Sequence, residues 1–306
     1  MTVNSAVRGP TFINIGPGRC ATSWLLSCLK SHPEIAMARV KETEYFNTHF
    51  DRGDDWYREH FPEASVPASG EISSNYYLDP AVAKRIQQYD PEMKIVINLR
   101  QPFRLLESFH AFGLRRGLEL GALKDSLDFP IGKIMGSGYD FRVAKNSLTV
   151  GDSKTLIESV CLADCLRPFL EIFEPHRVHF FILERLQDQH EMVLSELYSF
   201  LGVAHDYLPL DADKIVNSSM APKSKTLARM ATKASFLLRR VGAHGLLSQL
   251  HRSELVKKIL FNKSDQAEGA QEPSSCRDHL DAATVSRLDD QIEQMKILCP
   301  ELGQWW

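Results

Sequence analysis

The sequence predicts an α/β fold in which helices cover a mainly parallel sheet. Short apolar runs of strand length alternate with helical segments from residue 12 to residue 201, and this alternation is typical of parallel sheets joined by helices. The run Lys94–Leu99 is compact and mostly β-branched, as expected of a buried strand. A Gly-Pro-Gly turn at 16–18 leads from the first apolar run into the first helix. The chain therefore opens with a strand, a tight turn and a helix.

Local signals define the elements up to residue 89. His32-Pro33 stops the first helix. Asp79 and Pro80 open a later helix as its cap and its first residue. The expected elements are a strand at 12–15, a helix ending near 31, a strand at 35–40, a polar loop with a short helix at 51–61, a turn at 66–70, a brief extended piece at 71–73 and a helix at 80–89.

The rest of the chain continues the alternation and then changes character at Leu210. Pro102 is suited to the first turn of the helix that follows the strand predicted at 94–99. We expect one domain at 11–306, with a core at 11–201, a helical elaboration at 210–306 and an N-terminal extension at 1–10. The expected segments are a strand at 94–99, a helix at 103–116, a Gly-rich loop or lid at 117–154, a helix at 156–173, a strand at 178–183, a helix at 187–201, a basic stretch at 223–233, an amphipathic helical stretch at 234–260 that packs on the core, a polar stretch at 262–275 and a closing helix at 282–298.

Composition limits the classes of function. The chain is 43% hydrophobic and 25% charged, with a net charge of −3, so nothing draws the whole molecule to nucleic acid or anionic membranes. No apolar run approaches the roughly 20 residues of a membrane span, and the N-terminus does not resemble a signal peptide. The six cysteines are scattered, without a C-x-x-C pair. We therefore expect a reduced, cytoplasmic protein that holds no metal.

The opening turn is a candidate phosphate site. Loop amides and a helix N-terminus direct unpaired N–H groups to one place, and Arg19 adds a planar cation suited to oxyanions. Residues 16–21 fit the dinucleotide fingerprint G-x-G-x-x-G/A, with Glu42 near the expected acidic position, although Pro17 and the bulky Arg19 argue against it. A Walker A loop would lack its lysine. Residues 19–23 fit a phosphosulfate loop, in which Lys or Arg precedes a small residue and then Thr or Ser.

Two further sites follow the second and the longest strands. Arg100 ends the strand at 94–99, and Ser108 lies eight residues later in the next helix, where open α/β sheets hold ligands; a surface arginine paired with a glutamate is the alternative. Glu42 follows the strand at 35–40 beside aromatic residues and is a candidate general base that Lys41 keeps ionised. Glu44 is expected to point elsewhere along an extended segment. Solvated charges after a strand are the alternative here.

In combination these motifs resemble a known family. The order is the phosphate loop, then Lys41-Glu42-x-x-Tyr45-Phe46, then Glu71-x-Ser73-x-x-Tyr76, then Arg100-x-Pro102 with Ser108. This order resembles the sulfotransferases that use 3′-phosphoadenosine 5′-phosphosulfate (PAPS), and most resembles their carbohydrate branch, the heparan sulfate N- and 3-O-sulfotransferases and their bacterial relatives. The resemblance runs from about residue 12 to residue 201 and more loosely to the C-terminal tryptophan. It implies a P-loop-like, three-layer α/β domain.

The resemblance also implies roles for individual residues. Glu42 would be the base that takes a proton from an acceptor hydroxyl or amine, with Arg19 and Lys41 supplying positive charge at the transferring sulfonate. The implied nucleotide-binding residues are Gly18, Arg19, Cys20, Ala21, Thr22, Ser23 and Trp24 for the 5′-phosphosulfate, Arg100 and Ser108 for the 3′-phosphate, and Lys223, Ser224 and Lys225 in a loop that closes over the nucleotide. Candidates on the acceptor side are Glu71, Ser73, Tyr76, His49 and His110.

Two departures from the family pattern stand out. Ala21 occupies a position where the family usually has glycine, and Ile72 replaces a lysine of the heparan-type enzymes. The resemblance implies PAPS as donor, adenosine 3′,5′-bisphosphate (PAP) as product, no metal, and a carbohydrate or other small-molecule acceptor. A P-loop kinase acting on a small metabolite, a dinucleotide-dependent oxidoreductase and a nucleotide-binding relative without transfer activity are the alternatives. The acceptor itself and the oligomeric state do not follow from the sequence.

Overall fold

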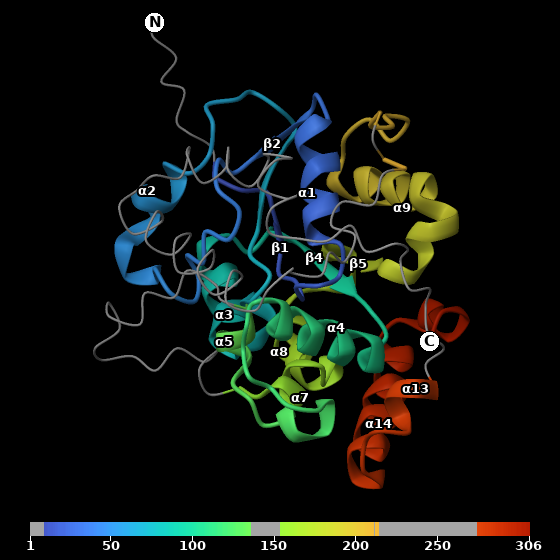
Figure 1. Cartoon of the computed structure of the whole chain (residues 1–306). Coiled ribbons are helices and arrows are strands. Elements are labelled where there is room, and N and C mark those ends of the chain that lie inside the picture. Colours follow the sequence, from blue (N-terminus) through green and yellow to red (C-terminus); the bar gives the residue numbers. More distant parts are fainter. Residues whose placement is uncertain (1–8, 136–153, 211, 214–273) are drawn as a thin grey trace, which may run out of the picture.

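The fold is built on one parallel sheet of five strands in the order β2-β3-β1-β4-β5 (Figure 1). It is seen in a computed structural model that describes residues 9–135, 154–210, 212–213 and 274–306. The α/β fold with a parallel sheet predicted from the sequence is confirmed. The strands are β1 (Phe12–Asn14), β2 (Ile35–Met37), β3 (Ala68–Ile72), β4 (Lys94–Leu99) and β5 (Val178–Ile182).

The strand order places a crevice at the carboxyl ends of β1 and β4. β1 lies between β3 and β4, and the chain leaves it toward β2 on one side. The chain leaves β4 in the opposite direction, toward β5. Open α/β sheets bind ligands where connections diverge in this way. The turn after β1 and the residues after β4 are therefore neighbours at the place where a ligand is expected.

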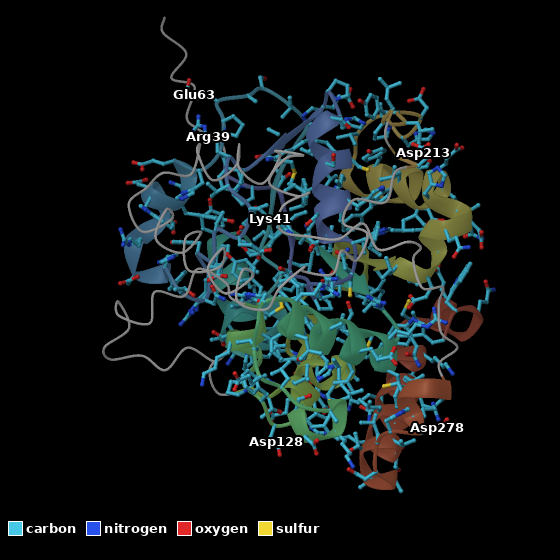
Figure 2. The ribbon with its side chains drawn as sticks, viewed as in Figure 1. Arg39, Lys41, Glu63, Asp128, Asp213 and Asp278 are labelled. Carbon is cyan, nitrogen blue, oxygen red and sulfur yellow. The ribbon has the colours of Figure 1, made fainter. Side chains whose placement is uncertain are left out.

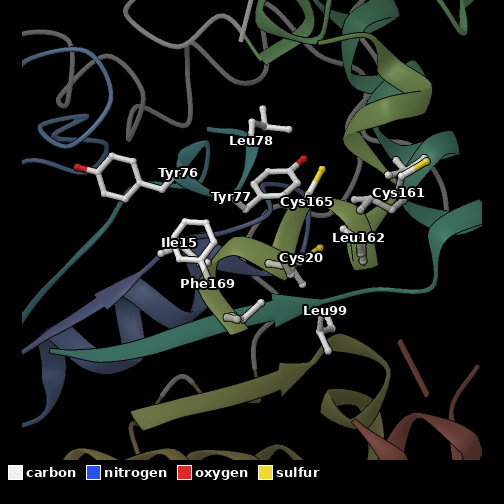
Figure 3. Close-up of a cluster of buried hydrophobic side chains, with 14 of the residues drawn as sticks. Ile15, Cys20, Tyr76, Tyr77, Leu78, Leu99, Cys161, Leu162, Cys165 and Phe169 are labelled. Carbon is white, nitrogen blue, oxygen red and sulfur yellow. The ribbon is translucent and has the colours of Figure 1, made fainter. Parts of the chain in front are cut away.

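Helices cover both faces of the sheet (Figure 1). One buried cluster joins β1 to α1 and α9 through Phe12, and the opposite cluster joins it to α3, α4, α8 and α14 through Ile13, as the alternation of side chains along a strand requires. Figure 3 shows part of the second cluster, with Phe169 of α8 beside Ile15 and Cys165 of α8 beside Tyr77. The helices are α1 (Thr22–Ser31), α2 (Gly53–Arg58), α3 (Pro80–Tyr89), α4 (Pro102–Arg115), α5 (Ile131–Met135), α7 (Leu156–Ser159), α8 (Leu162–Ile172), α9 (Leu186–Leu201), α13 (Ser274–Arg277) and α14 (Ala282–Leu298).

The prediction of a turn at 66–70 is wrong. Those residues lead into β3, which is hydrogen-bonded to strands on both sides. Gly70 lies within this strand because the ring of Phe12 stands 2.3 Å from the place where a Cβ would be. The small residues at 68–70 therefore serve close packing on the next strand, and their turn propensity is overridden by the sheet.

Three other boundaries differ from the prediction. The helix expected at 156–173 is divided into α7 and α8, and β2 ends at Met37 instead of residue 40. The segment 117–135, expected as a loop, contains α5 and a short 3₁₀ turn at Leu123–Ser126. Residues 136–153 of the expected lid, the stretches at 223–233 and 234–260, and nearly all of 262–275 lie outside the described residues.

Candidate active site

Two buried asparagines hold the turn between β1 and α1 in place. Asn14 ends β1 and Asn98 lies beside it on β4, and the Asn14 Nδ2 donates a hydrogen bond to the Asn98 Oδ1. The Asn14 Oδ1 accepts from the Gly16 N–H at 3.1 Å, and the Asn98 Nδ2 donates to the Cys20 carbonyl at 2.6 Å. Both ends of the turn are thus fixed by side chains of the central strands. The sequence analysis did not single out these asparagines, and their only signal was a polar residue in each apolar run.

Left-handed backbone conformations gather around this turn. Arg19, Ala21, Glu42 and Glu44 have φ angles of 65°, 58°, 61° and 51°, and they are the only non-glycine residues with positive φ in the part of the chain that the structure describes. Such conformations cost free energy and concentrate at functional sites. Ala21 occupies the position where the resembled family usually has glycine, and its positive φ explains why glycine suits that position.

The first turn of α1 is open to an anion. Ala21 is the cap residue of α1 and offers no side-chain hydrogen bond to the N–H groups of the first turn. An uncapped helix N-terminus carries unpaired donors and a partial positive charge. The hydroxyls of Thr22 and Ser23 stand at the same end and accept hydrogen bonds from Lys41 at 3.1 and 3.2 Å. This end of α1 therefore combines backbone donors, hydroxyls and one cation.

Arg19 lies on the side of the turn that faces α4. Its Nε donates to the Ser108 Oγ at 3.2 Å, and its guanidinium carbon stands 4.9 Å from the centre of the Phe112 ring. Arg100 donates to the Arg19 carbonyl at 3.1 Å. Burial, together with the nearby charges of Arg115 and Arg100, lowers the pKa of Arg19 to about 10. The structure thus brings together the three residues Arg19, Arg100 and Ser108 that the sequence analysis assigned to phosphate groups.

Glu42 is held at the opposite side of the turn. Its two carboxylate oxygens accept hydrogen bonds from the N–H and the Oγ of Ser74, both at 2.6 Å. Lys41 lies 3.5 Å from the same carboxylate and also contacts the hydroxyls at the start of α1. The side chains of Lys41 and Glu42 are 26% and 27% exposed, and Figure 2 labels Lys41 among the surrounding side chains. Lys41 therefore links the candidate base to the phosphate loop, while Arg19 points toward α4.

Glu44 does not point away along an extended segment, as the sequence analysis expected. Residues two apart in an extended segment lie on the same side, so the spacing of Glu42 and Glu44 did not support that expectation, and both residues have left-handed backbone conformations instead of extended ones. Glu44 is 4% exposed, and its carboxyl group accepts hydrogen bonds from Asn75 at 3.3 Å and from Thr48 at 3.5 Å. The charge of Glu42 also acts on this carboxyl group. Burial, together with Glu42, raises the pKa of Glu44 to about 8. Two carboxyl groups therefore stand near one another, and the buried one holds its proton at neutral pH.

Glu71, Ser73 and Tyr76 form a buried polar cluster. Each is 0% exposed, and the Glu71 carboxylate accepts hydrogen bonds from Ser73 at 2.8 Å, Tyr76 at 3.0 Å, Tyr57 at 2.6 Å and Thr43. Burial raises the pKa of Glu71, and these hydrogen bonds oppose the increase. The expectation that these residues face an acceptor does not fit this burial. They support the chain between the Glu42 segment and β3.

The two candidate histidines lie apart from the phosphate loop. His49 packs against Trp56 with ring centres 5.2 Å apart, and burial lowers its pKa. His110 and Ser108 are two residues apart on α4, so they face different sides of the helix. The His110 Nε2 lies 3.2 Å from the Gly121 carbonyl, and the ring lines a pocket of about 760 Å³ with Cys276. The structure does not bring His110 to Glu42.

The remaining candidate nucleotide-binding residues have mostly buried side chains. Cys20 is 0% exposed, and Trp24 is 5% exposed with its Nε1 donating to the Ala212 carbonyl at 3.0 Å. A Cβ on Gly18 would stand 2.5 Å from the Met135 Cε. These residues therefore offer backbone groups rather than side chains to a ligand. Lys223, Ser224 and Lys225 lie outside the described residues.

Comparisons with known proteins find sulfotransferases. No family model matches the chain. The membrane-associated sulfotransferase kil1 of Dictyostelium discoideum is 33% identical over 106 residues, covering 33% of this chain and 22% of the relative. The human bifunctional heparan sulfate N-deacetylase/N-sulfotransferase 3 is 27% identical over 209 residues, covering 65% of this chain and 23% of the relative. The mouse heparan sulfate glucosamine 3-O-sulfotransferase 6 is 27% identical over 126 residues, covering 36% of each. These similarities support the resemblance to sulfotransferases found in the sequence.

The fold agrees with this similarity. A crystal structure of a sulfotransferase from Alicyclobacillus acidocaldarius matches with a TM-score of 0.54 and 22% identity, covering 82% of this chain and 99% of that one. This likeness shows the fold alone. The chain spans between 22% and 36% of the length of the three curated relatives named above. The similarity to sulfotransferases supports the phosphosulfate interpretation of the loop over the kinase alternative.

The cytoplasmic location expected from the sequence is wrong. It rested on composition, whereas the similar protein kil1 is a membrane-associated sulfotransferase. Among the described residues, no helix has the length and apolar character needed to cross a membrane. Nor does that part of the chain contain a group of three or more His, Cys, Asp or Glu side chains arranged to hold a metal.

Proposed function

We propose that this chain transfers a sulfonate group from PAPS to a hydroxyl or amine of a carbohydrate acceptor. The observation that carries the proposal is the position of Glu42, held by Ser74 on one side and linked through Lys41 to the phosphate loop on the other. A base, a cation and an anion-binding helix end stand together at the carboxyl edge of a parallel sheet. The similarity to sulfotransferases supports the same reaction.

The residues around the crevice fit a nucleotide with phosphate groups at both ends of its ribose. The uncapped end of α1 with Thr22 and Ser23 suits the 5′-phosphosulfate. Arg100, Arg19 and Ser108 suit the 3′-phosphate, because arginine binds phosphate oxygens with two parallel N–H groups. When bound, PAPS supplies an activated sulfonate, so the residues of this chain have to position it and move a proton.

Glu42 acts as the general base. A carboxylate has about four acceptor positions, and Ser74 occupies two of them, which leaves capacity for an acceptor hydroxyl. Glu42 takes the proton of that hydroxyl while the acceptor oxygen forms a bond to sulfur. The bond between sulfur and the bridging phosphate oxygen breaks, and PAP leaves with its electron pair.

Lys41 stabilises the charge that develops in this step. Its ammonium group lies between Glu42 and the hydroxyls of Thr22 and Ser23, so it can contact the sulfonate and the leaving phosphate oxygen without a change of fold. Ile72, where heparan-type enzymes carry a lysine, is 1% exposed in β3. We infer that Lys41 supplies the charge that Ile72 cannot.

The acceptor and the extent of the domain are part of the same proposal. The heparan sulfate enzymes among the relatives support a glycan acceptor. We also propose that residues 11–306 form one domain, because α14 and the C-terminal turn contribute Met295 and Leu302 to the cluster that covers the sheet.

The test is a transfer assay with radiolabelled PAPS and a panel of desulfated glycans, together with calorimetry of PAP. Glu42→Gln is expected to keep its affinity for PAP and to lose turnover by about a hundredfold or more, the usual contribution of a general base. Glu63→Gln, a change at an exposed glutamate, is the control. Turnover of Glu42→Gln near the wild-type rate would remove Glu42 from the mechanism, and failure of the wild-type chain to bind PAP would overturn the proposed function.

A further inference from the structure

One face of α4 carries a second positive group beside the proposed phosphate site. Ser108, Phe112 and Arg115 are spaced by four and three residues on α4, so they lie on the same face of the helix. The guanidinium carbons of Arg19 and Arg115 stand 4.9 and 6.0 Å from the centre of the same Phe112 ring. The Arg116 guanidinium carbon also stands 5.8 Å from this centre, so Phe112 gathers one arginine from the loop and two from the end of α4 around its ring by cation–π contact.

The arginines beside the loop are not neutralised by direct ion pairs in the described structure. Within the described residues, none of Arg19, Arg100 and Arg115 makes an ion pair with a carboxylate. Glu184, at the end of β5, accepts hydrogen bonds from a backbone N–H at 2.8 Å and from Trp306 at 3.3 Å. Burial lowers the pKa of Arg19 and Arg115. Like charges held together in a half-buried place are stabilised by a bound anion.

The neighbouring arginine on α4, Arg116, contacts the same ring but differs from Arg115 in its hydrogen bonding. The Arg116 guanidinium donates to the Ile134 carbonyl at 2.8 Å, which anchors it to α5. Arg115 lies in the last turn of α4, where a cation also interacts favourably with the helix dipole. A purely structural role for Arg115 would therefore require only its charge, whereas a ligand role requires its planar fork.

We propose that Arg115 is a further nucleotide-binding residue, which pairs with the 3′-phosphate on the Ser108 face of α4. Through it the site selects nucleotides that carry a phosphate at the 3′ position as well as at the 5′ position. This inference rests on the proposed function. It adds to the loop and strand ligands a residue that the sequence motifs did not indicate.

The test compares two nucleotides by calorimetry on the full chain. PAP carries both phosphates, and adenosine 5′-monophosphate (AMP) lacks the one at the 3′ position. Arg115→Gln is expected to weaken PAP binding by about tenfold or more, the loss of one charge-assisted hydrogen bond, while AMP affinity changes by less than about twofold. Arg167→Gln removes a positive charge from an exposed ion pair on α8 and is the control, with both affinities unchanged.

Several results would overturn the inference. Unchanged PAP affinity in Arg115→Gln, with a wild-type chain that binds PAP, would remove Arg115 from the site and leave the proposed function intact. Equal losses for PAP and AMP would assign Arg115 a structural role. If the Gln variant does not fold, Arg115→Lys keeps the charge at the helix end, and it must still lose PAP affinity relative to AMP. A wild-type chain that does not bind PAP would overturn the proposed function as well.

Discussion

The buried carboxyl of Glu44 makes the stability of this protein depend on pH, and Glu44→Gln should remove that dependence. The pKa of Glu44 rises from its usual 4.5 to about 8 in the folded state. Between these values the folded chain holds a proton that the unfolded chain releases, so stability falls as pH rises from about 4.5 to about 8. One pH unit corresponds to about 1.4 kcal/mol, and the full interval to about 5 kcal/mol as an upper value.

Glutamine is the appropriate replacement because it is nearly isosteric and never ionises. Its amide group can accept from Thr48 as the carboxyl does and can donate to Asn75, whose buried Oδ1 has no partner within the described residues. The variant is therefore expected to equal the wild-type chain near pH 4.5 and to become more stable by about 1.4 kcal/mol for each pH unit above it, with the gain levelling off near pH 8.

The assay is urea denaturation followed by far-UV circular dichroism at pH 5, 6, 7 and 8. At each pH, the free energy of unfolding of the wild type is subtracted from that of the variant. This difference cancels the titration of groups that the substitution does not affect. Glu63→Gln, at the exposed glutamate labelled in Figure 2, should give a difference that does not change with pH. If the Glu44→Gln difference is also constant across this range, Glu44 is ionised in the folded protein and the reasoning is refuted.

Two further substitutions test the loop. Lys41→Met should lower sulfonate transfer by about a hundredfold or more because a charge beside the reacting group is lost; single-turnover assays measure this, and the exposed Lys84→Met serves as control. Transfer at the wild-type rate would contradict the role of Lys41. Ala21→Gly should stabilise the protein by about 1 kcal/mol or less, since Ala21 has a φ of 58° and glycine adopts this conformation without strain. Reduced stability in urea would contradict it.

The parts of the site that follow apolar strands could be predicted from the sequence. β1 with its turn and β4 are short apolar runs with clear ends, so the residues that follow them, such as Arg19 and Arg100, were correctly expected at one edge of the sheet. β3 could not be recognised, because Gly70 owes its place to the Phe12 ring on the neighbouring strand. A contact between strands far apart in the sequence leaves no local pattern.

Backbone conformation explains the other differences. Glu44 was expected to point away from Glu42, although residues two apart on an extended strand lie on the same side. Both residues are left-handed, with Thr43 between them, and the charge of Glu42 contributes to the raised pKa of Glu44. The burial of Glu71 also could not be predicted, because four hydroxyl groups brought from separate segments make that burial tolerable. Charged residues in a short motif suggested surface positions, and only the assembled fold shows which of them are enclosed.

The pair formed by Asn14 and Asn98 has a consequence for how this protein tolerates change. The loop is shaped by amides that belong to the two middle strands, so its conformation is already fixed without a ligand, and binding of the proposed donor need not spend free energy on ordering it. Asn14 and Asn98 are thus buried core residues that also set the shape of the proposed binding loop. A substitution at Asn98, far from any solvent, should behave in evolution and in the laboratory as a change to the nucleotide pocket.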